Sequence, residues 1–151
     1  MNRKINLVFG LLVSAAALIA ILVLFSTAFG SDSTYGVAST RGNGFQIMFG
    51  YQGKVVVVPL VIAFSLELLA ILLALFACIM PGKISMFGLG IAGICLAAGA
   101  VLFLLAPSFY VSANAITTEI PTNGTGTIMN AVFGFIGALL GLYGAYRVSK
   151  A

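Results

Sequence analysis

The chain has 151 residues, of which 62% are hydrophobic and 7% are charged, and its mean hydropathy is +1.21. Soluble domains carry about a quarter charged residues, so this composition excludes a soluble globular domain and predicts a single membrane domain over residues 1–151. The seven basic and three acidic residues give a formal net charge of +4. The bases lie at the ends of apolar runs, which the positive-inside rule explains, so the charge does not indicate a nucleic-acid partner.

The first apolar run covers residues 5–29 and follows a short basic start, Arg3 and Lys4. It is longer than the core of a signal peptide, which is about 7–15 residues. A helix needs roughly 20 apolar residues to cross a bilayer. We therefore interpret this run as the first membrane span.

A polar loop, residues 30–54, separates the first two runs. Residues 35–40 and 45–52 are predicted to form two strands, joined by the Gly-Asn-Gly sequence at 42–44, whose residues tolerate positive φ. The second strand is predicted from apolar residues that alternate with period two: Phe45, Ile47, Phe49 and Tyr51. Phe45, Phe49 and Tyr51 are candidates for an outer interface. The alternative is that the hairpin is a lid over the helix ends.

The second apolar run, residues 55–80, carries a single charge, Glu67. Small residues share the helical face of this acid, at spacings of three and four: Pro59, Ala63, Ala70, Ala74 and Ala77. Small residues let another helix approach closely in lipid. We therefore expect this helix to pack through its Glu67 face, with the acid pointing into protein.

A carboxylate near the bilayer centre costs about 2.5–3.5 kcal/mol on insertion scales, and the spans contain no Lys, Arg or His to pair with it. By helix rise, the polar residues at a similar depth are Ser14, Ser65 and Cys95. Without a cation, we expect Glu67 to be at least partly protonated at neutral pH. Two interpretations stay open. In the first, Glu67 forms a proton or cation site with Ser14 and Cys95. In the second, a neutral Glu67 joins helices by hydrogen bonding.

The rest of the chain alternates in the same way. An inner loop at residues 81–83 leads to a third span at 84–106, an outer loop at 107–127 and a fourth span at 128–146. The inner loop is so short that spans two and three must be antiparallel neighbours. Small residues mark the faces on which these helices are predicted to pack: Gly88, Ala92, Gly99, Gly137 and Gly141. These faces also suit a pore wall or self-association.

Orientation follows from counting bases. One side of the membrane is predicted to hold Arg3, Lys4, Lys83, Arg147 and Lys150, and the other only Arg41 and Lys54. The positive-inside rule places the five-base side in the cytoplasm. We expect a multi-pass plasma-membrane protein with both termini cytoplasmic.

The layout resembles that of small four-span membrane proteins of Gram-positive bacteria and mollicutes. The similar parts are the Asn2-Arg3-Lys4 start, the run from Gly44-Phe45 to Phe49-Gly50, and the glycine-rich fourth span. That resemblance implies no activity. The topology also resembles that of claudins, with four spans, inner termini and a strand-bearing first outer loop. The claudin tryptophan and paired loop cysteines are absent from this sequence, so claudin-type strand assembly does not carry over.

These observations predict an all-α membrane protein, an antiparallel four-transmembrane-helix bundle with a small extracellular β-hairpin in its first loop. The chain has no histidine, no thiol beside a base and no phosphate-binding glycine loop, so we expect no enzyme activity, no metal and no cofactor. The expected partners are the lipid bilayer and either further copies of the chain or a larger membrane protein. The expected function is that of a structural or accessory subunit. The alternative is a channel or transporter subunit that uses Glu67.

Overall fold

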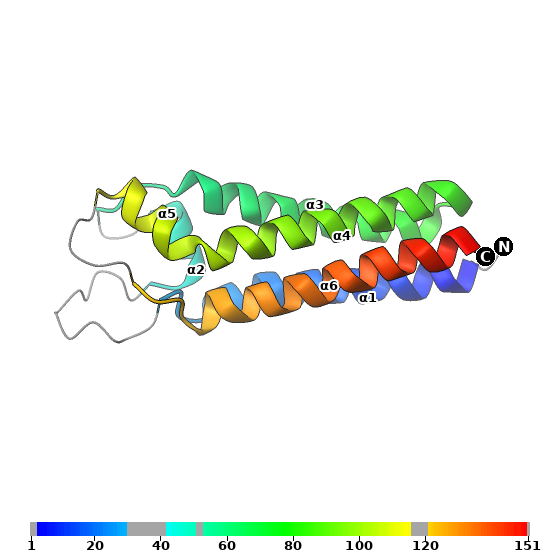
Figure 1. Cartoon of the computed structure of the whole chain (residues 1–151), viewed down its shortest axis with the longest axis horizontal. Helices are drawn as coiled ribbons and strands as arrows, with labels where there is room; N and C mark the ends of the chain where they lie inside the picture. The colour runs from blue at the N-terminus through cyan, green and yellow to red at the C-terminus, as the bar shows by residue number, and fades with distance from the viewer. Residues whose placement is uncertain (1–2, 30–41, 51–52, 116–120, 151) are drawn as a thin grey trace.

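The computed structural model describes residues 3–29, 42–50, 53–115 and 121–150. Four long helices dominate it (Figure 1): α1 (Arg3–Leu22), α3 (Val58–Ile79), α4 (Gly82–Leu104) and α6 (Thr125–Lys150). All four, with α1 extended by the 3₁₀ turn η1 (Val23–Phe25), are long and apolar enough to cross a membrane. The predicted bundle of four apolar helices is therefore confirmed. Two short helices, α2 (Gly44–Phe49) and α5 (Ala106–Ala113), lie at one end.

The helices run up and down. The start of α1, the end of α6 and the α3–α4 connection lie at one end of the bundle, and α2 and α5 lie at the other (Figure 1). Only Met80 and Pro81 separate α3 from α4, and Gly82 adopts φ 54° at the turn, a left-handed conformation that suits glycine. Each long helix packs mainly on two neighbours, so α1 and α4 lie on a diagonal.

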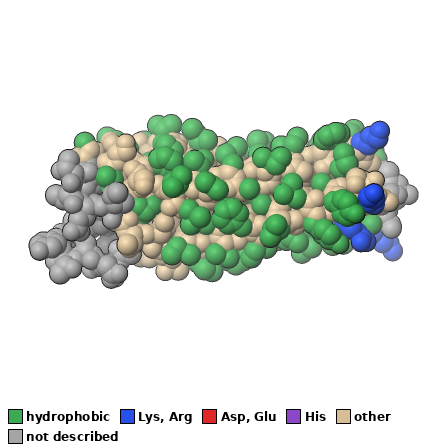
Figure 2. Space-filling model, in the orientation of Figure 1, with side chains coloured by type: hydrophobic (Ala, Val, Ile, Leu, Met, Phe, Trp, Pro, Cys, Tyr) green, Lys and Arg blue, Asp and Glu red, His purple; other side chains and the backbone are tan. Residues whose placement is uncertain are grey.

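Large apolar side chains face outward and small ones face inward. Leu72, Ile79 and Leu139 are between 64% and 69% exposed, and apolar side chains cover the helices along the visible face (Figure 2). The inner face of α3 consists largely of buried alanines: Ala63, Ala70, Ala74 and Ala77. This arrangement suits a bilayer, where lipid tails solvate large side chains and close backbone approach holds the helices together.

The predicted β-hairpin is wrong. Residues 44–49 form helix α2 in place of the expected second strand, and the described residues contain isolated bridges but no strand. The expected first strand, residues 35–40, lies outside the described residues. The physical reason is a capping box. The Asn43 side chain accepts a hydrogen bond from the backbone N–H of Gln46, and the Gln46 side chain accepts one from the backbone N–H of Asn43. A short period-two alternation does not outweigh these local hydrogen bonds.

Helix α2 closes the end of the bundle opposite the α3–α4 turn (Figure 1). Ile47 and Met48 are buried in a cluster with Leu24, Leu60 and Phe103. The Val57 amide also donates to the Met48 carbonyl at 2.9 Å, which ties α2 to the start of α3. Helix α2 therefore covers the ends of the long helices.

The segment after η1 is bonded to the start of α6. Gly124 and Gly126 donate their amides to the carbonyls of Ala28 (2.8 Å) and Thr27 (2.7 Å), and Thr127 Oγ1 donates to Ala28 O at 2.9 Å. A Cβ on Gly124 would lie 2.7 Å from the Thr27 oxygen, so the close approach requires glycine here. These bonds fix the depth of α6 relative to α1.

The burial of Tyr110, which lies on α5 outside the long helices, leads to a prediction about pH. Its side chain is 1% exposed, its hydroxyl has no hydrogen-bond partner among the described residues, and burial raises its pKa above the usual value near 10. The folded state thus holds the phenol proton more tightly than the unfolded chain, so stability decreases as pH rises above about 10. We expect Tyr110→Phe to stabilise the protein by about 1 kcal/mol at pH 7 and to weaken this alkaline loss.

Thermal unfolding in detergent at pH 7 and pH 11 measures both effects. Tyr143→Phe is the control, because Tyr143 is 52% exposed, so removing its hydroxyl should not stabilise the protein at pH 7. A loss of stability in Tyr110→Phe at pH 7 would show that the hydroxyl is bonded.

Basic side chains gather at the end where α1 starts and α6 ends (Figure 2). Arg3, Lys4, Lys83, Arg147 and Lys150 belong to helix ends there. The cytoplasmic location of this end stays a prediction of the charge count.

Candidate functional site

Glu67 lies at the middle of the bundle with 0% of its surface exposed. It belongs to the alanine face of α3, between Ala63 and Ala70, and both of these alanines are also fully buried. Small neighbours on the same face bring the other helices close to the acid. The carboxyl group therefore points into protein and away from lipid.

The partner of Glu67 is Asn130 on α6, which is itself fully buried. Asn130 Nδ2 donates to Glu67 Oε1 at 2.9 Å and to Oε2 at 3.1 Å. The same nitrogen donates to the carbonyl of Ala20 at 2.9 Å. That carbonyl belongs to the last turn of α1, where backbone acceptors lack a partner within the helix. One amide group thus joins α1, α3 and α6.

The fourth helix presses against the same carboxyl group. A Cβ built on Gly99 of α4 would lie 3.1 Å from Glu67 Cγ and 3.4 Å from Oε1. A side chain at this position would be in tight contact with the acid. All four long helices therefore meet around Glu67.

One atom of the site is unsatisfied. Asn130 Oδ1 is buried and accepts no hydrogen bond from the described part of the chain, whereas both Glu67 oxygens share the Nδ2 donor. A neutral Glu67 carries one O–H donor. This O–H is the kind of donor that Oδ1 lacks, and the other carboxyl oxygen remains an acceptor for Nδ2. The pair thus has matched partners when the acid is neutral.

No base within the described part of the chain lies beside Glu67, because the described Lys and Arg side chains are all exposed or half-buried near helix ends. A buried carboxylate without a cation is costly. The geometry therefore suits hydrogen bonding by a neutral acid better than an ion pair.

The other candidate site residues lie elsewhere. Ser14 Oγ donates to Gly10 O on its own helix at 2.7 Å, and Ser65 Oγ donates to Val61 O at 2.8 Å. Cys95 is buried in the apolar cluster around Ala70 and Ala74. Among the described residues, none of these three side chains bonds Glu67.

The predicted packing residues lie at the helix contacts. A Cβ on Gly88 would lie 3.3 Å from Leu73 O of α3, and one on Gly137 would lie 2.6 Å from the Leu96 side chain and 3.2 Å from that of Ala16. Ala92 is fully buried. Gly141 contacts the backbone of α4, so α4 and α6 meet there without intervening side chains.

The candidate outer interface is divided. Phe45 packs against Phe25 and Phe64, with ring centroids 4.8 and 5.5 Å apart. Phe49 is 50% exposed, with its ring 6.2 Å from that of Phe64. Tyr51 lies outside the described residues. Phe45 thus belongs to the bundle cap, and Phe49 presents an exposed edge.

Comparisons of the chain with protein-family models, curated proteins and solved structures found no match. The described residues also contain no cluster of three or more His, Cys, Asp or Glu side chains that could hold a metal ion.

Proposed function

We propose that the chain is a non-enzymatic integral membrane protein, a structural or accessory subunit that self-associates or binds a larger membrane complex. The observation that carries this proposal is the bonding of Glu67: its side chain is 0% exposed, and both oxygens are held by an amide that also bonds α1. An acid used for transport needs access to solvent on at least one side. An acid that holds four helices together needs the opposite.

The surface gives further support. Outside the long helices, the described chain contributes only short elements, α2 and α5. Apolar side chains are spread along the helices on the face that Figure 2 shows. Such a protein has more surface for contacts within the membrane than for partners in water.

A second candidate function, a channel or transporter subunit, is favoured by one observation. Asn130 Oδ1 is a buried acceptor with no donor among the described residues, and its side chain is bonded to a carboxyl group. An unpaired oxygen acceptor beside a carboxyl group suits a proton or a small cation. In this alternative, Glu67 gains and loses a proton as it works.

Glu67→Gln separates the two proposals. A glutamine amide can accept from Asn130 Nδ2 and donate to Oδ1, so we expect stability within about 1 kcal/mol of the parent. For the structural proposal, proteoliposomes of both proteins should show no difference in proton or sodium flux. In mild detergent, the parent and the Glu67→Gln protein should form particles of the same protein mass, and this mass should exceed that of one 15.6 kDa chain.

Ser65→Ala is the matched control, since Ser65 lies on the exposed side of the same helix. A flux in the parent protein that Glu67→Gln abolishes and Ser65→Ala preserves would establish the transport proposal. A particle containing one chain and no partner would contradict the structural one.

A further inference from the structure

A groove opens on the membrane-facing surface between α4 and α6, at the end of the bundle where the basic residues lie. Its volume is about 330 Å³. It is lined by Phe87, Gly90 and Ile94 from α4 and by Ala145, Tyr146 and Ser149 from α6, among others. A Cβ on Gly90 would have only the Cβ of Ala145, at 3.8 Å, within 4 Å. The groove therefore exists because small residues face each other at its floor.

The walls of the groove are long apolar and aromatic side chains. Phe87 and Ile94 are each 61% exposed, and Tyr146 is 56% exposed. A groove with a small-residue floor and tall apolar walls suits a narrow, flexible, apolar chain.

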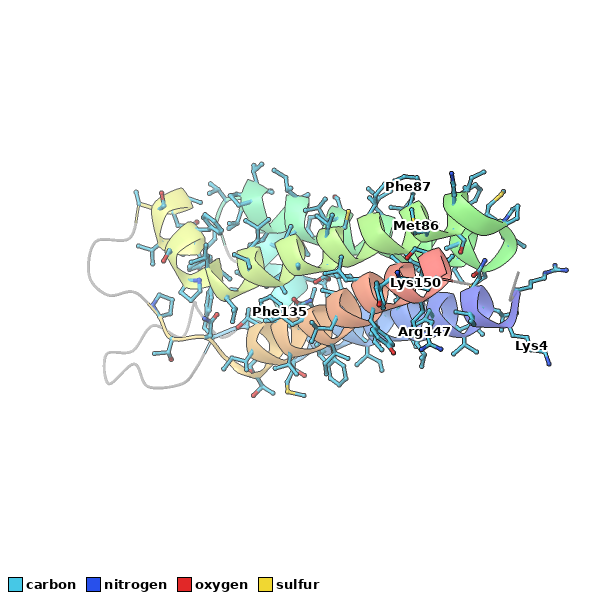
Figure 3. All side chains as sticks on the ribbon, turned by 45° about the vertical axis from the view of Figure 1, so that its right-hand side comes forward. Lys4, Met86, Phe87, Phe135, Arg147 and Lys150 are labelled. Atoms are coloured by element: carbon cyan, nitrogen blue, oxygen red, sulfur yellow. The ribbon has the colours of Figure 1, made fainter. Side chains whose placement is uncertain are left out.

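Positive charge lies at the mouth of this groove. Lys150 Nζ is 6.0 Å from the centroid of the Tyr146 ring, which forms part of the wall. Figure 3 shows Met86 and Phe87 on α4 close to the end of α6 that carries Lys150, while Lys4 extends from the start of α1 beyond the end of the bundle. Glu67 is the one acid among the described residues, and it is buried at the middle of the bundle. The mouth is therefore basic without a neighbouring described carboxylate.

We propose that the groove binds an anionic phospholipid, with one acyl chain between α4 and α6 and the headgroup phosphate at Lys150. The apolar part alone would not select a lipid, because every bilayer lipid has similar tails. Selection comes from the charge at the mouth, since a basic side chain near a membrane surface attracts anionic headgroups. This inference is independent of the role of Glu67.

A second copy of the chain is the competing occupant. All copies inserted in one orientation place the same cluster of bases at the same membrane surface. A parallel copy seated in the groove would bring like charges together, which opposes association. A lipid phosphate neutralises the same charges instead.

The test is native mass spectrometry of the purified full chain, titrated with phosphatidylglycerol or with phosphatidylcholine of identical acyl chains. We expect one phosphatidylglycerol to bind at least fivefold more tightly than phosphatidylcholine. Lys150→Ala should weaken phosphatidylglycerol binding about fivefold. Gly90→Leu, which fills the floor, should weaken binding of both lipids. Lys4→Ala removes a base from the same end but away from the groove, so it should leave binding unchanged.

Equal binding of the two lipids by the parent would overturn the proposal. So would an equal loss in Lys4→Ala and Lys150→Ala, because this would indicate a diffuse electrostatic attraction. A fall in particle mass in Gly90→Leu would assign the groove to a second copy. The exposed Lys150 variant keeps the proposal testable if Gly90→Leu does not fold.

Discussion

Replacing Gly141 by alanine is expected to destabilise the bundle by about 3 kcal/mol, near the upper end of overpacking effects. A Cβ at this position would lie 2.8 Å from Leu89 O, 2.9 Å from Gly93 Cα and 3.0 Å from Gly93 N. All three atoms belong to the backbone of α4, so no side-chain rotation can relieve the clash. The two helices would have to separate along their contact.

The contact between α4 and α6 is equally close at Gly93, the glycine of α4 that faces Gly141. A Cβ on Gly93 would lie 2.9 Å from Ala138 O and 3.2 Å from the Leu142 amide nitrogen of α6. Because lipid tails are as apolar as the helix surfaces, close packing supplies much of the force that holds such helices together. Loss of this contact therefore removes a large share of the stability of the bundle.

Gly90→Ala is the matched control for Gly141→Ala. Gly90 is on α4 about one turn from Gly93, but its nearest neighbour, the Ala145 Cβ, would lie 3.8 Å from an added Cβ, which is ordinary contact. We expect its stability to stay within about 0.5 kcal/mol of the parent. Reversible unfolding in mixed micelles measures both variants, and equal stability of the two would contradict the backbone contact.

The second large effect is expected for Asn130→Leu, which should cost about 3 kcal/mol. This substitution leaves Glu67 buried without its donor and leaves the Ala20 carbonyl unpaired. Removing one partner of a buried polar pair costs more than removing both, because the remaining group loses its compensation. Unfolding in mixed micelles again provides the free energy.

A double-mutant cycle tests whether the cost comes from the pair. Glu67→Met keeps an unbranched side chain beside Gly99, which a branched residue would crowd. We expect Glu67→Met/Asn130→Leu to be more stable than Asn130→Leu alone, with a coupling of about 1–2 kcal/mol. Additive effects of the two substitutions would show that Glu67 and Asn130 act independently.

The partner of Glu67 could not be found by counting residues along the expected spans. With spans at 55–80 and 128–146, Glu67 lies ten residues deeper than Asn130, or about 15 Å. In the structure, Glu67 is the tenth residue of Val58–Ile79 and Asn130 is the sixth of Thr125–Lys150. The difference shrinks to four residues, about 6 Å, which the length of the glutamate side chain and helix tilt can bridge. A lone amide in an apolar helix was the available signal.

The short helices α2 and α5 were also not predictable from the pattern of apolar residues. The alternation of Phe45, Ile47 and Phe49 fits a strand, yet the same residues form α2 because Asn43 and Gln46 cap it. Residues 107–127 were expected to form a loop, yet helix α5 continues to Ala113, with Pro107 in its first turn. Over a few residues, an apolar pattern does not distinguish a strand or a loop from one turn of helix.

By itself, the sequence determined the class of the protein, its four long helices, the sharp turn between α3 and α4, and the small-residue face around Glu67. These features follow from the absence of water in a bilayer, which requires each spanning backbone to bond within its own helix. Only the tertiary structure decided that Asn130 joins Glu67 to the Ala20 carbonyl and that α4 and α6 leave a groove between them. It also decided that Gly99 packs against Glu67 and that Gly141 packs against the backbone of α4. The physical reason is that these contacts depend on the relative depth and rotation of neighbouring helices, which side-chain packing sets in three dimensions.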